Sequence, residues 1–115
     1  MITFIVPGRP VPAARMTQRG KFVSQQAQRY LAYKGQVGYI ARSRCRKPIE
    51  GPVGVEIHAY VFGGRAGDID NISKSILDGC NNIVWEDDRQ VVELHTFRHT
   101  GRPQRAEIAV WEITG

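Results

Sequence analysis

Cysteine is scarce in this chain of 115 residues, which contains only Cys45 and Cys80 and no C-x-x-C pair. Neither cysteine has a histidine nearby at ligand spacing, so the sequence supports neither a disulfide framework nor a zinc site. Two unpaired thiols are typical of a reducing compartment. We therefore expect a cytoplasmic protein.

Long apolar runs are also missing from the sequence. The first apolar stretch, Ile2 to Val6, is too short for a signal peptide or a membrane-spanning helix. Repeats and low-complexity tracts are absent. A chain of this length fits a single domain, residues 1–115, that can bury a core without disulfides or metals.

Acidic residues are nearly absent from the first half of the chain. Residues 1–50 carry ten Lys and Arg residues against the single acid Glu50, whereas residues 51–115 carry six against ten acids. The basic half therefore has a net charge of +9, compared with −4 for the rest and +5 for the whole chain. This imbalance predicts a surface that binds a polyanion, with a solubilising basic surface as the plain alternative.

The hydrophobic pattern predicts four strands and two helices in the order β-α-β-α-β-β. The expected strands cover residues 2–6, 53–62, 91–98 and 105–113, and the expected helices run from 25 to about 42 and from 70 to 80. Ser24 suits the N-cap of the first helix, and Asn81-Asn82 can end the second in a left-handed conformation. The turn at residues 100–103 predicts a hairpin of the last two strands. The expected class is α+β, a small mixed sheet covered by two helices.

Half of the ten acids of the second half lie in two short segments. Gly67 to Lys74 has the pattern D-x-D-N-x-x-K, in which Asp68 lies in a loop and Asp70 and Lys74 are one helical turn apart. Trp85 to Asp88 then adds an acidic pair. Carboxylates that crowd together repel one another unless a cation lies between them, and Mg²⁺ is the hard cation that prefers oxygen ligands.

Chain geometry can bring the two acidic groups together. A helix of about twelve residues spans ~18 Å, and the residues from Asn82 to Asp88, if extended, span roughly 20 Å. A return antiparallel to the helix would place Asp87 and Asp88 at its N-terminus, where the helix dipole favours anions. The sequence thus predicts a Mg²⁺ site beside a phosphate, suited to phosphodiester cleavage, with the nearby lysine holding the phosphate.

Other interpretations need no metal site. Asp70 would then be a helix cap, Lys74 its salt-bridge partner and Asp87-Asp88 a polar turn, in a non-catalytic nucleic-acid-binding module. A D-x-D nucleotidyl or glycosyl transferase is a further alternative, but the chain is short for such a fold and has no glycine-rich phosphate motif. Three histidines, His58, His95 and His99, are expected to be surface or satisfied residues.

Taken together, the motifs resemble those of the RusA family of Holliday junction resolvases. The resemblance is densest over residues 67–92, where D-x-D-N-x-x-K is followed by Leu77-Asp78 and then by V-W-E-D-D-R-Q-V-V. It is looser at the N-terminus, where Pro10-Val11-Pro12, Arg15 and Arg19-Gly20-Lys21 are similar to the basic loop of the family. With the compatible order of elements, the resemblance covers most of the chain.

The resemblance implies a Mg²⁺-dependent, homodimeric endonuclease that resolves four-way DNA junctions by paired nicks in recombination and repair, with Mn²⁺ as a substitute metal. Its catalytic residues would be Asp68, Asp70, Lys74 and Asp88, in a catalytic segment of residues 67–92. The metal ligands would come from Asp68, Asp70, Asp87 and Asp88, and the choice between the last two stays open. DNA contacts are expected from Arg9, Arg15, Arg19, Lys21 and Lys74, mostly in the basic half. A membrane partner and a small-molecule cofactor are not expected.

Overall fold

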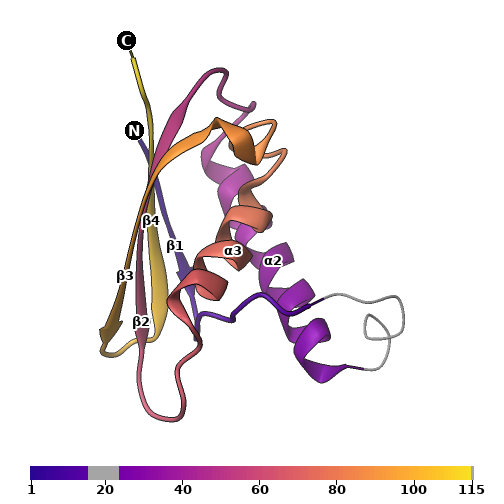
Figure 1. Ribbon diagram of the computed structural model, residues 1–115, viewed down its shortest axis with the longest axis vertical. Coiled ribbons are helices and arrows are strands. Elements are labelled where there is room, and N and C mark those ends of the chain that lie inside the picture. Colours follow the sequence, from indigo (N-terminus) through magenta and orange to yellow (C-terminus); the bar gives the residue numbers. More distant parts are fainter. Residues whose placement is uncertain (16–23, 115) are drawn as a thin grey trace.

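The computed structural model describes residues 1–15 and 24–114, and these residues form a sheet with two α-helices on one face (Figure 1). The elements are β1 (Ile2–Pro7), α2 (Gln25–Arg44), β2 (Val53–Val61), α3 (Ile69–Cys80), the 3₁₀ helix η1 (Asp88–Gln90), β3 (Val91–Thr100) and β4 (Arg105–Glu112). The predicted α+β class and the predicted order of elements are therefore confirmed. In the described parts of the chain, no helix has the length and apolar character needed to cross a membrane.

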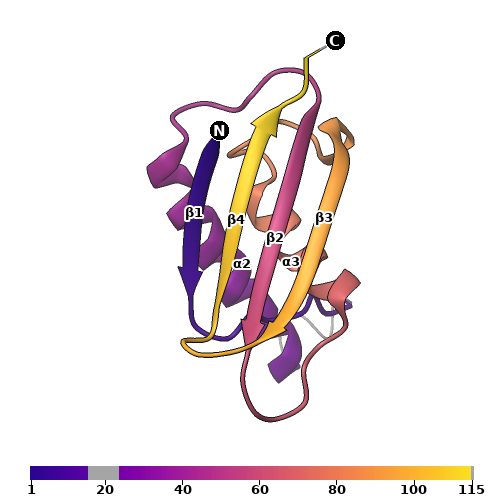
Figure 2. The ribbon, with the colours of Figure 1, turned by 90° about the vertical axis from the view of Figure 1, so that its left-hand side faces the viewer.

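The four strands form one mixed sheet in the order β1-β4-β2-β3 (Figure 2). Strand β2 pairs antiparallel with β4 and parallel with β3, and β1 pairs antiparallel with β4. The predicted hairpin of the last two strands is wrong, because β2 lies between them. The connection between β3 and β4 instead passes the end of β2, where the amide of Gly101 donates to the carbonyl of Val61.

The burial of β2 fits its interior position in the sheet. All its residues that face the helices, from Val53 to Val61, are at most 7% exposed. Strand β3 has no buried residue at all. A period-2 pattern indicates one apolar face, but it does not tell how many neighbours a strand has. The short turn at residues 100–103 therefore predicted a hairpin, whereas in the structure the apolar strand β2 lies between β3 and β4.

The core lies between the sheet and the two helices. Its largest fully buried side chain is Trp85, which follows α3, and Cys80 is equally buried. Cys45 also belongs to this core. Other members are Phe4, Val6, Val37, Ala41, Val55, Ile57, Ile72, Ile76, Ile108 and Val110.

Two glycines allow α2 and α3 to pack closely. A Cβ atom on Gly79 would lie 2.7 Å from Cβ of Val37 and 2.9 Å from the carbonyl oxygen of Lys34. A Cβ atom on Gly38 would lie 3.1 Å from the carbonyl oxygen of Gly79. The helix backbones thus come close enough that only glycine fits at both positions without a shift.

The ends of the helices follow the predicted capping residues. The Ser24 hydroxyl accepts a hydrogen bond from the amide of Ala27 at 3.2 Å, which caps α2. After α3, Asn82 has a φ of 67°, the left-handed conformation that ends the helix. Asp68 is the N-cap residue of α3.

The sheet face away from the helices carries a row of stacked rings. The His58 ring stacks on Phe97 and on His99, with centroid distances of 4.8 Å and 5.1 Å, and Tyr60 stacks on His99 at 4.6 Å. Nδ1 of His58 lies 2.8 Å from Nε2 of His99, and its Nε2 lies 3.0 Å from a carboxylate oxygen of Glu56. His58 and His99 are thus satisfied by neighbouring side chains, as expected.

Candidate active site

The first turn of α3 presents two carboxylates to solvent. Asp68, the N-cap residue, makes no side-chain capping hydrogen bond, and both Asp68 and Asp70 are exposed. The Asp70 carboxylate accepts a local hydrogen bond from the amide of Asn71 at 3.0 Å. Because Asp70 is not the N-cap residue, its interpretation as a simple helix cap is wrong. Both carboxylates retain oxygen atoms that can bind a cation.

Lys74 lies one turn further along α3, but it pairs with Asp78 and not with Asp70. Its Nζ atom is 3.4 Å from Oδ2 of Asp78, and the Lys74 side chain is 63% exposed. The same oxygen accepts a short hydrogen bond from the Tyr30 hydroxyl of α2. Burial, reinforced by this hydrogen bond, raises the pKa of Tyr30 well above its ordinary value. An exposed i,i+4 ion pair is worth only about 0.3–0.5 kcal/mol, so Lys74 can exchange Asp78 for a phosphate.

A cleft of ≈ 670 Å³ opens beside Asp68. Its walls come from residues 9–15, from the beginning of α2 and from the loop that precedes α3. The arginines that line it are Arg9, Arg15, Arg29 and Arg65. Such a group of guanidinium groups attracts a phosphate backbone and can hold it beside the carboxylates.

Arg9 also has a structural part in this cleft. Its Nη1 donates to the carbonyl oxygens of Gly63 at 2.7 Å and Phe62 at 3.2 Å, and to Oε1 of Gln104 at 2.8 Å. Its Nη2 donates to the carbonyl oxygen of Arg65 at 2.9 Å. The guanidinium of Arg9 therefore joins the N-terminal segment to the loop after β2, and its predicted DNA contact stays a prediction.

The backbone just before Asp68 is held by close contacts. Nη1 of Arg98, near the end of β3, donates to the carbonyl oxygen of Gly67 at 2.8 Å. A Cβ atom on Gly67 would lie 2.8 Å from Cγ of Pro12, so glycine is needed for this approach. The amide of Ala13 donates to the carbonyl oxygen of Asn71 at 2.8 Å. These contacts place Asp68 without using its carboxylate.

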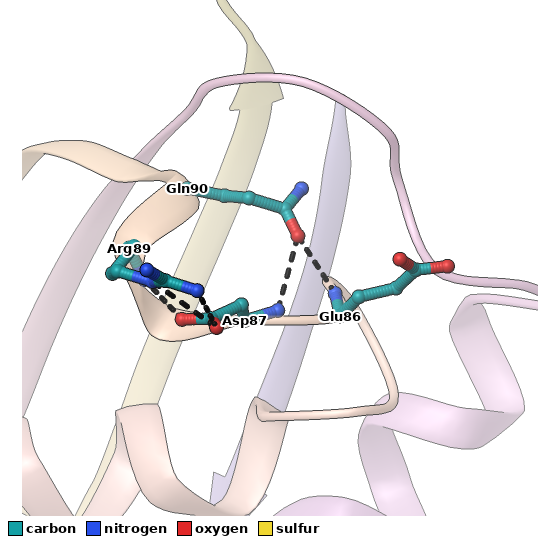
Figure 3. A network of polar contacts seen from close by, with 4 residues as sticks. All are labelled: Glu86, Asp87, Arg89 and Gln90. Atoms are coloured by element: carbon teal, nitrogen blue, oxygen red, sulfur yellow. Dashed lines mark hydrogen bonds and ion pairs between the residues drawn. The ribbon is translucent and has the colours of Figure 1, made fainter.

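Asp87, the first residue of the second acidic pair, lies in a loop held by several hydrogen bonds (Figure 3). Asp87 caps η1, accepting from the amide of Arg89 at 2.8 Å and from its guanidinium at 3.0 Å and 3.2 Å. The hydrogen bonds from the Arg89 side chain lower the pKa of Asp87. Oε1 of Gln90 accepts from the amides of Glu86 and Asp87 at 2.9 Å and 3.0 Å, which completes a capping box. Both Asp87 oxygens are thus occupied within the loop.

The Asp88 carboxylate accepts fewer hydrogen bonds than the Asp87 carboxylate. Its Oδ1 accepts a hydrogen bond from the indole Nε1 of buried Trp85 at 2.8 Å, and its side chain is exposed. Burial, followed by the charge of Asp88, raises the pKa of Cys80 to about 12. The geometry therefore favours Asp88 over Asp87 as a ligand, and it places Asp88 beside the last residue of α3.

The two acidic groups lie at opposite ends of α3. Asp68 and Asp70 are at its N-terminus, while η1 lies beyond its C-terminus (Figure 1). A helix of 12 residues is ~18 Å long. The predicted return of Asp87 and Asp88 to the N-terminus of this helix is therefore wrong.

A compact turn after α3 explains the difference. The amides of Ile83 and Val84 both donate to the carbonyl oxygen of Cys80, and the amide of Asn82 donates to that of Trp85. Because of these bonds, residues 82–88 do not run back along α3 as an extended segment, as had been predicted. Among residues 1–15 and 24–114, no three Asp, Glu, His or Cys side chains lie close enough together to hold a metal ion. The described part of one copy does not assemble the predicted four-carboxylate set.

Comparison with known proteins places the chain in a family. The sequence profile described as Endodeoxyribonuclease RusA matches residues 7–111. The chain belongs to the RusA family. RusA proteins are endodeoxyribonucleases, hydrolases of the Holliday junction resolvase type, so the resemblance noted in the sequence is confirmed. A relative from Bacillus subtilis (strain 168), named "Uncharacterized protein YqaN", is 25% identical over 138 aligned positions, which cover 98% of this chain and 97% of the relative.

Some of the basic residues that line the cleft were predicted from the sequence, and others were not. Arg9 and Arg15, which were predicted to contact DNA, line the cleft, whereas Arg19 and Lys21 lie outside the described residues. Arg29 and Arg65 line the cleft too and were not among the predicted residues. The position of Arg65 in the loop just before D-x-D was a signal for it, whereas Arg29 has no local motif.

Proposed function

We propose that this RusA-family chain is a divalent-metal-dependent endonuclease that resolves four-way DNA junctions by nicking two strands. The observation that supports this most is the pair of exposed carboxylates, Asp68 and Asp70, beside a cleft lined by four arginines. A phosphate held by the arginines would lie next to carboxylates that can bind a metal ion. Metal-ion catalysis of phosphodiester cleavage uses this combination of a positioned phosphate and a bound metal.

Mg²⁺, with Mn²⁺ as a substitute, is the proposed cofactor. Asp68 and Asp70 fit it in number and kind, since protein-bound Mg²⁺ commonly uses one or two carboxylates together with water and substrate oxygens. When bound, the metal would activate a water molecule and stabilise the leaving oxygen. Lys74, exposed and weakly paired, would contact the scissile phosphate and offset the charge that develops there. Asp88 is proposed as a further catalytic ligand, with Asp87 supporting its loop.

The basic half of the chain would hold the arms of the junction through phosphate contacts, which carry no sequence information. Arg15 and Arg29, both exposed at the cleft, would make such contacts. A homodimer with two-fold symmetry would present two equivalent sites to a junction of similar symmetry. The proposed cellular role is DNA recombination and repair in the cytoplasm.

One observation favours a second candidate, a non-catalytic DNA-binding protein. The separation of Asp88 from Asp68 by the length of α3 leaves the acidic set incomplete within one copy. On that interpretation Asp87 and Asp88 serve only the loop around η1, and the arginine cleft binds DNA without cutting it.

Cleavage of a labelled synthetic four-way junction, compared with a linear duplex of the same sequence, separates the two candidates. We expect Mg²⁺-dependent nicks in the junction, little cutting of the duplex and no cutting in EDTA. The variant Asp70→Asn should lose nicking and keep junction binding in a gel-shift titration. Wild-type protein that binds the junction but leaves it intact across Mg²⁺ and Mn²⁺ titrations would establish the second candidate instead.

A further inference from the structure

Lys74 has a carboxylate one helical turn away on each side. Asp70 precedes it by four residues in α3 and Asp78 follows it by four, so either side chain is within reach of its ammonium group. An acid four residues before a lysine forms the better helical pair, and a carboxylate in the last turn of a helix is disfavoured by the dipole. The energetics of α3 alone therefore favour the pair of Lys74 with Asp70.

The structure shows the opposite pairing. Nζ of Lys74 lies 3.4 Å from Oδ2 of Asp78. In the part of the chain that the structure describes, Asp70 forms no ion pair, and its carboxylate accepts a local hydrogen bond from the amide of Asn71. A contact from outside α3 must therefore favour Asp78 as the partner of Lys74.

Tyr30 of α2 makes this contact. Its hydroxyl donates to Oδ2 of Asp78, the same oxygen that Lys74 approaches. Tyr30 is buried and the Asp78 side chain is only 18% exposed, so the carboxylate is held in place and partly shielded from water. Gly79, the residue after Asp78, allows the close approach of α2 at this point. Shielding strengthens an ion pair, and a fixed acceptor lowers the side-chain entropy that the pair costs.

We propose that Asp78, held by Tyr30, is a positioning residue that keeps the ammonium group of Lys74 away from Asp70 in the absence of DNA. Asp70 then stays available to a divalent cation, and Lys74 stays available to a phosphate. The inference rests on the proposed function, because it takes Asp70 as a metal ligand and Lys74 as a phosphate contact. It goes further by giving a part to Tyr30 and Asp78, which touch neither ligand.

Binding of Mn²⁺ without DNA tests the inference and needs no activity. In Asp78→Asn, Lys74 loses its partner and turns to Asp70, where its ammonium group competes with the cation. The dissociation constant for Mn²⁺, measured from the electron paramagnetic resonance signal of the free ion, should rise about twofold, the factor that corresponds to one i,i+4 ion pair. When Lys74→Gln is already present, Asp78→Asn should leave the constant unchanged, because no ammonium group can move.

The comparison of these two backgrounds separates positioning from charge. If Asp78→Asn weakens Mn²⁺ binding equally with and without Lys74, the loss of a negative charge explains the effect and the inference is overturned. An unchanged constant in Asp78→Asn would overturn it as well. Glu50→Gln, which removes one exposed charge from the loop between α2 and β2, is the matched control and should bind Mn²⁺ like the wild type. Circular dichroism confirms that each variant folds.

The Mg²⁺ dependence of junction nicking gives a second measurement. Asp78→Asn should need about twice as much Mg²⁺ for half-maximal nicking and should reach the wild-type rate at saturating Mg²⁺. Tyr30→Phe, which removes only the hydroxyl, should shift this concentration in the same direction and by less. A lower maximal rate in Asp78→Asn with an unchanged Mg²⁺ requirement would show that Asp78 is merely structural. Wild-type protein that nicks at no Mg²⁺ concentration would instead contradict the proposed function.

Discussion

The two ends of α3 use carboxylates in opposite ways. At the N-terminal end, Asp68 and Asp70 accept almost nothing from the described residues, and backbone contacts around Gly67 hold them in place. At the C-terminal end, Asp87 accepts three hydrogen bonds from Arg89, and Asp88 accepts one from Trp85. The carboxylates at the first end are available to bind a ligand, whereas those at the second end are hydrogen-bonded to the protein itself.

This difference teaches how to separate ligand carboxylates from structural ones. A carboxylate whose oxygens are already bonded contributes to stability, and its loss destabilises the fold. A carboxylate that is exposed and near another of the same charge contributes repulsion, and its loss is neutral or favourable for the fold. The difference between the two ends of α3 can therefore be tested by measuring stability and nicking in matched variants.

The largest expected effect is the loss of nicking in Asp68→Asn. We expect a decrease of more than about 10²-fold, because even groups that merely support metal ligands cost roughly 10–100-fold when they are changed. Its melting temperature in EDTA should equal or slightly exceed that of the wild type. Asp87→Asn is the matched control, with a lower melting temperature and a smaller loss of nicking. A marked fall in the melting temperature of Asp68→Asn would show that this end is structural too.

The next largest effect concerns the buried indole that holds Asp88. Trp85→Phe removes a donor and leaves a cavity, and it should lower the free energy of unfolding by about 2–3 kcal/mol in urea titrations. Nicking should also fall, because Asp88 loses the bond that positions it. Trp111→Phe, on the open sheet face, is the control and should cost less than half as much. Equal losses for both variants would argue against a special role for Trp85.

A pair of glycine variants probes the packing between the helices. Gly79→Ala introduces a contact of 2.7 Å with Val37 and should lower the free energy of unfolding by about 1–2 kcal/mol. Gly35→Ala meets no described atom within 4 Å and should raise it by roughly 0.5–1 kcal/mol, because alanine favours the helix. Thermal melts of both variants measure the two signs. Stabilisation by Gly79→Ala would mean that the helices can move apart at this end without cost.

The last expected effect is a dependence of stability on alkaline pH. In the folded protein the pKa of Cys80 is about 12, whereas an unfolded cysteine has a pKa of about 8.5. The unfolded state therefore loses its proton first, and the contribution of Cys80 to stability is lost progressively as pH rises above about 8.5. Melting temperatures measured from pH 7 to 10 should fall less steeply in Cys80→Ala than in the wild type. If the melting temperatures of the two proteins fall equally steeply with pH, a group other than Cys80 causes the pH dependence.

Sequence reasoning succeeded where the determining contacts are local. Ser24 caps α2 and Asn82 ends α3, and both follow from side chains that act within a few residues. The position of Asp68 at the N-terminus of α3 followed in the same way from the pattern around it.

The failures concern contacts between distant segments. The hairpin of β3 and β4 failed because β2 inserts between them, and a turn motif carries no information on that competition. The return of Asp88 failed because the amides of Ile83 and Val84 bond back to Cys80 and close a compact turn. The hydrogen bond from Arg9 to Gln104 could not be predicted either, because the two residues are 95 positions apart in the sequence.

The pairing of β1 with β4 has a consequence for how the protein folds. The first strand of the chain has the last one as its only neighbour in the described sheet, and their register joins Ile2 to Val110. A nascent chain therefore cannot complete its sheet until β4 has left the ribosome. Such distant pairing closes a large loop late and slows folding relative to sheets built from adjacent hairpins. We expect fragments that stop before Arg105 to leave β1 unpaired and to be degraded or to aggregate.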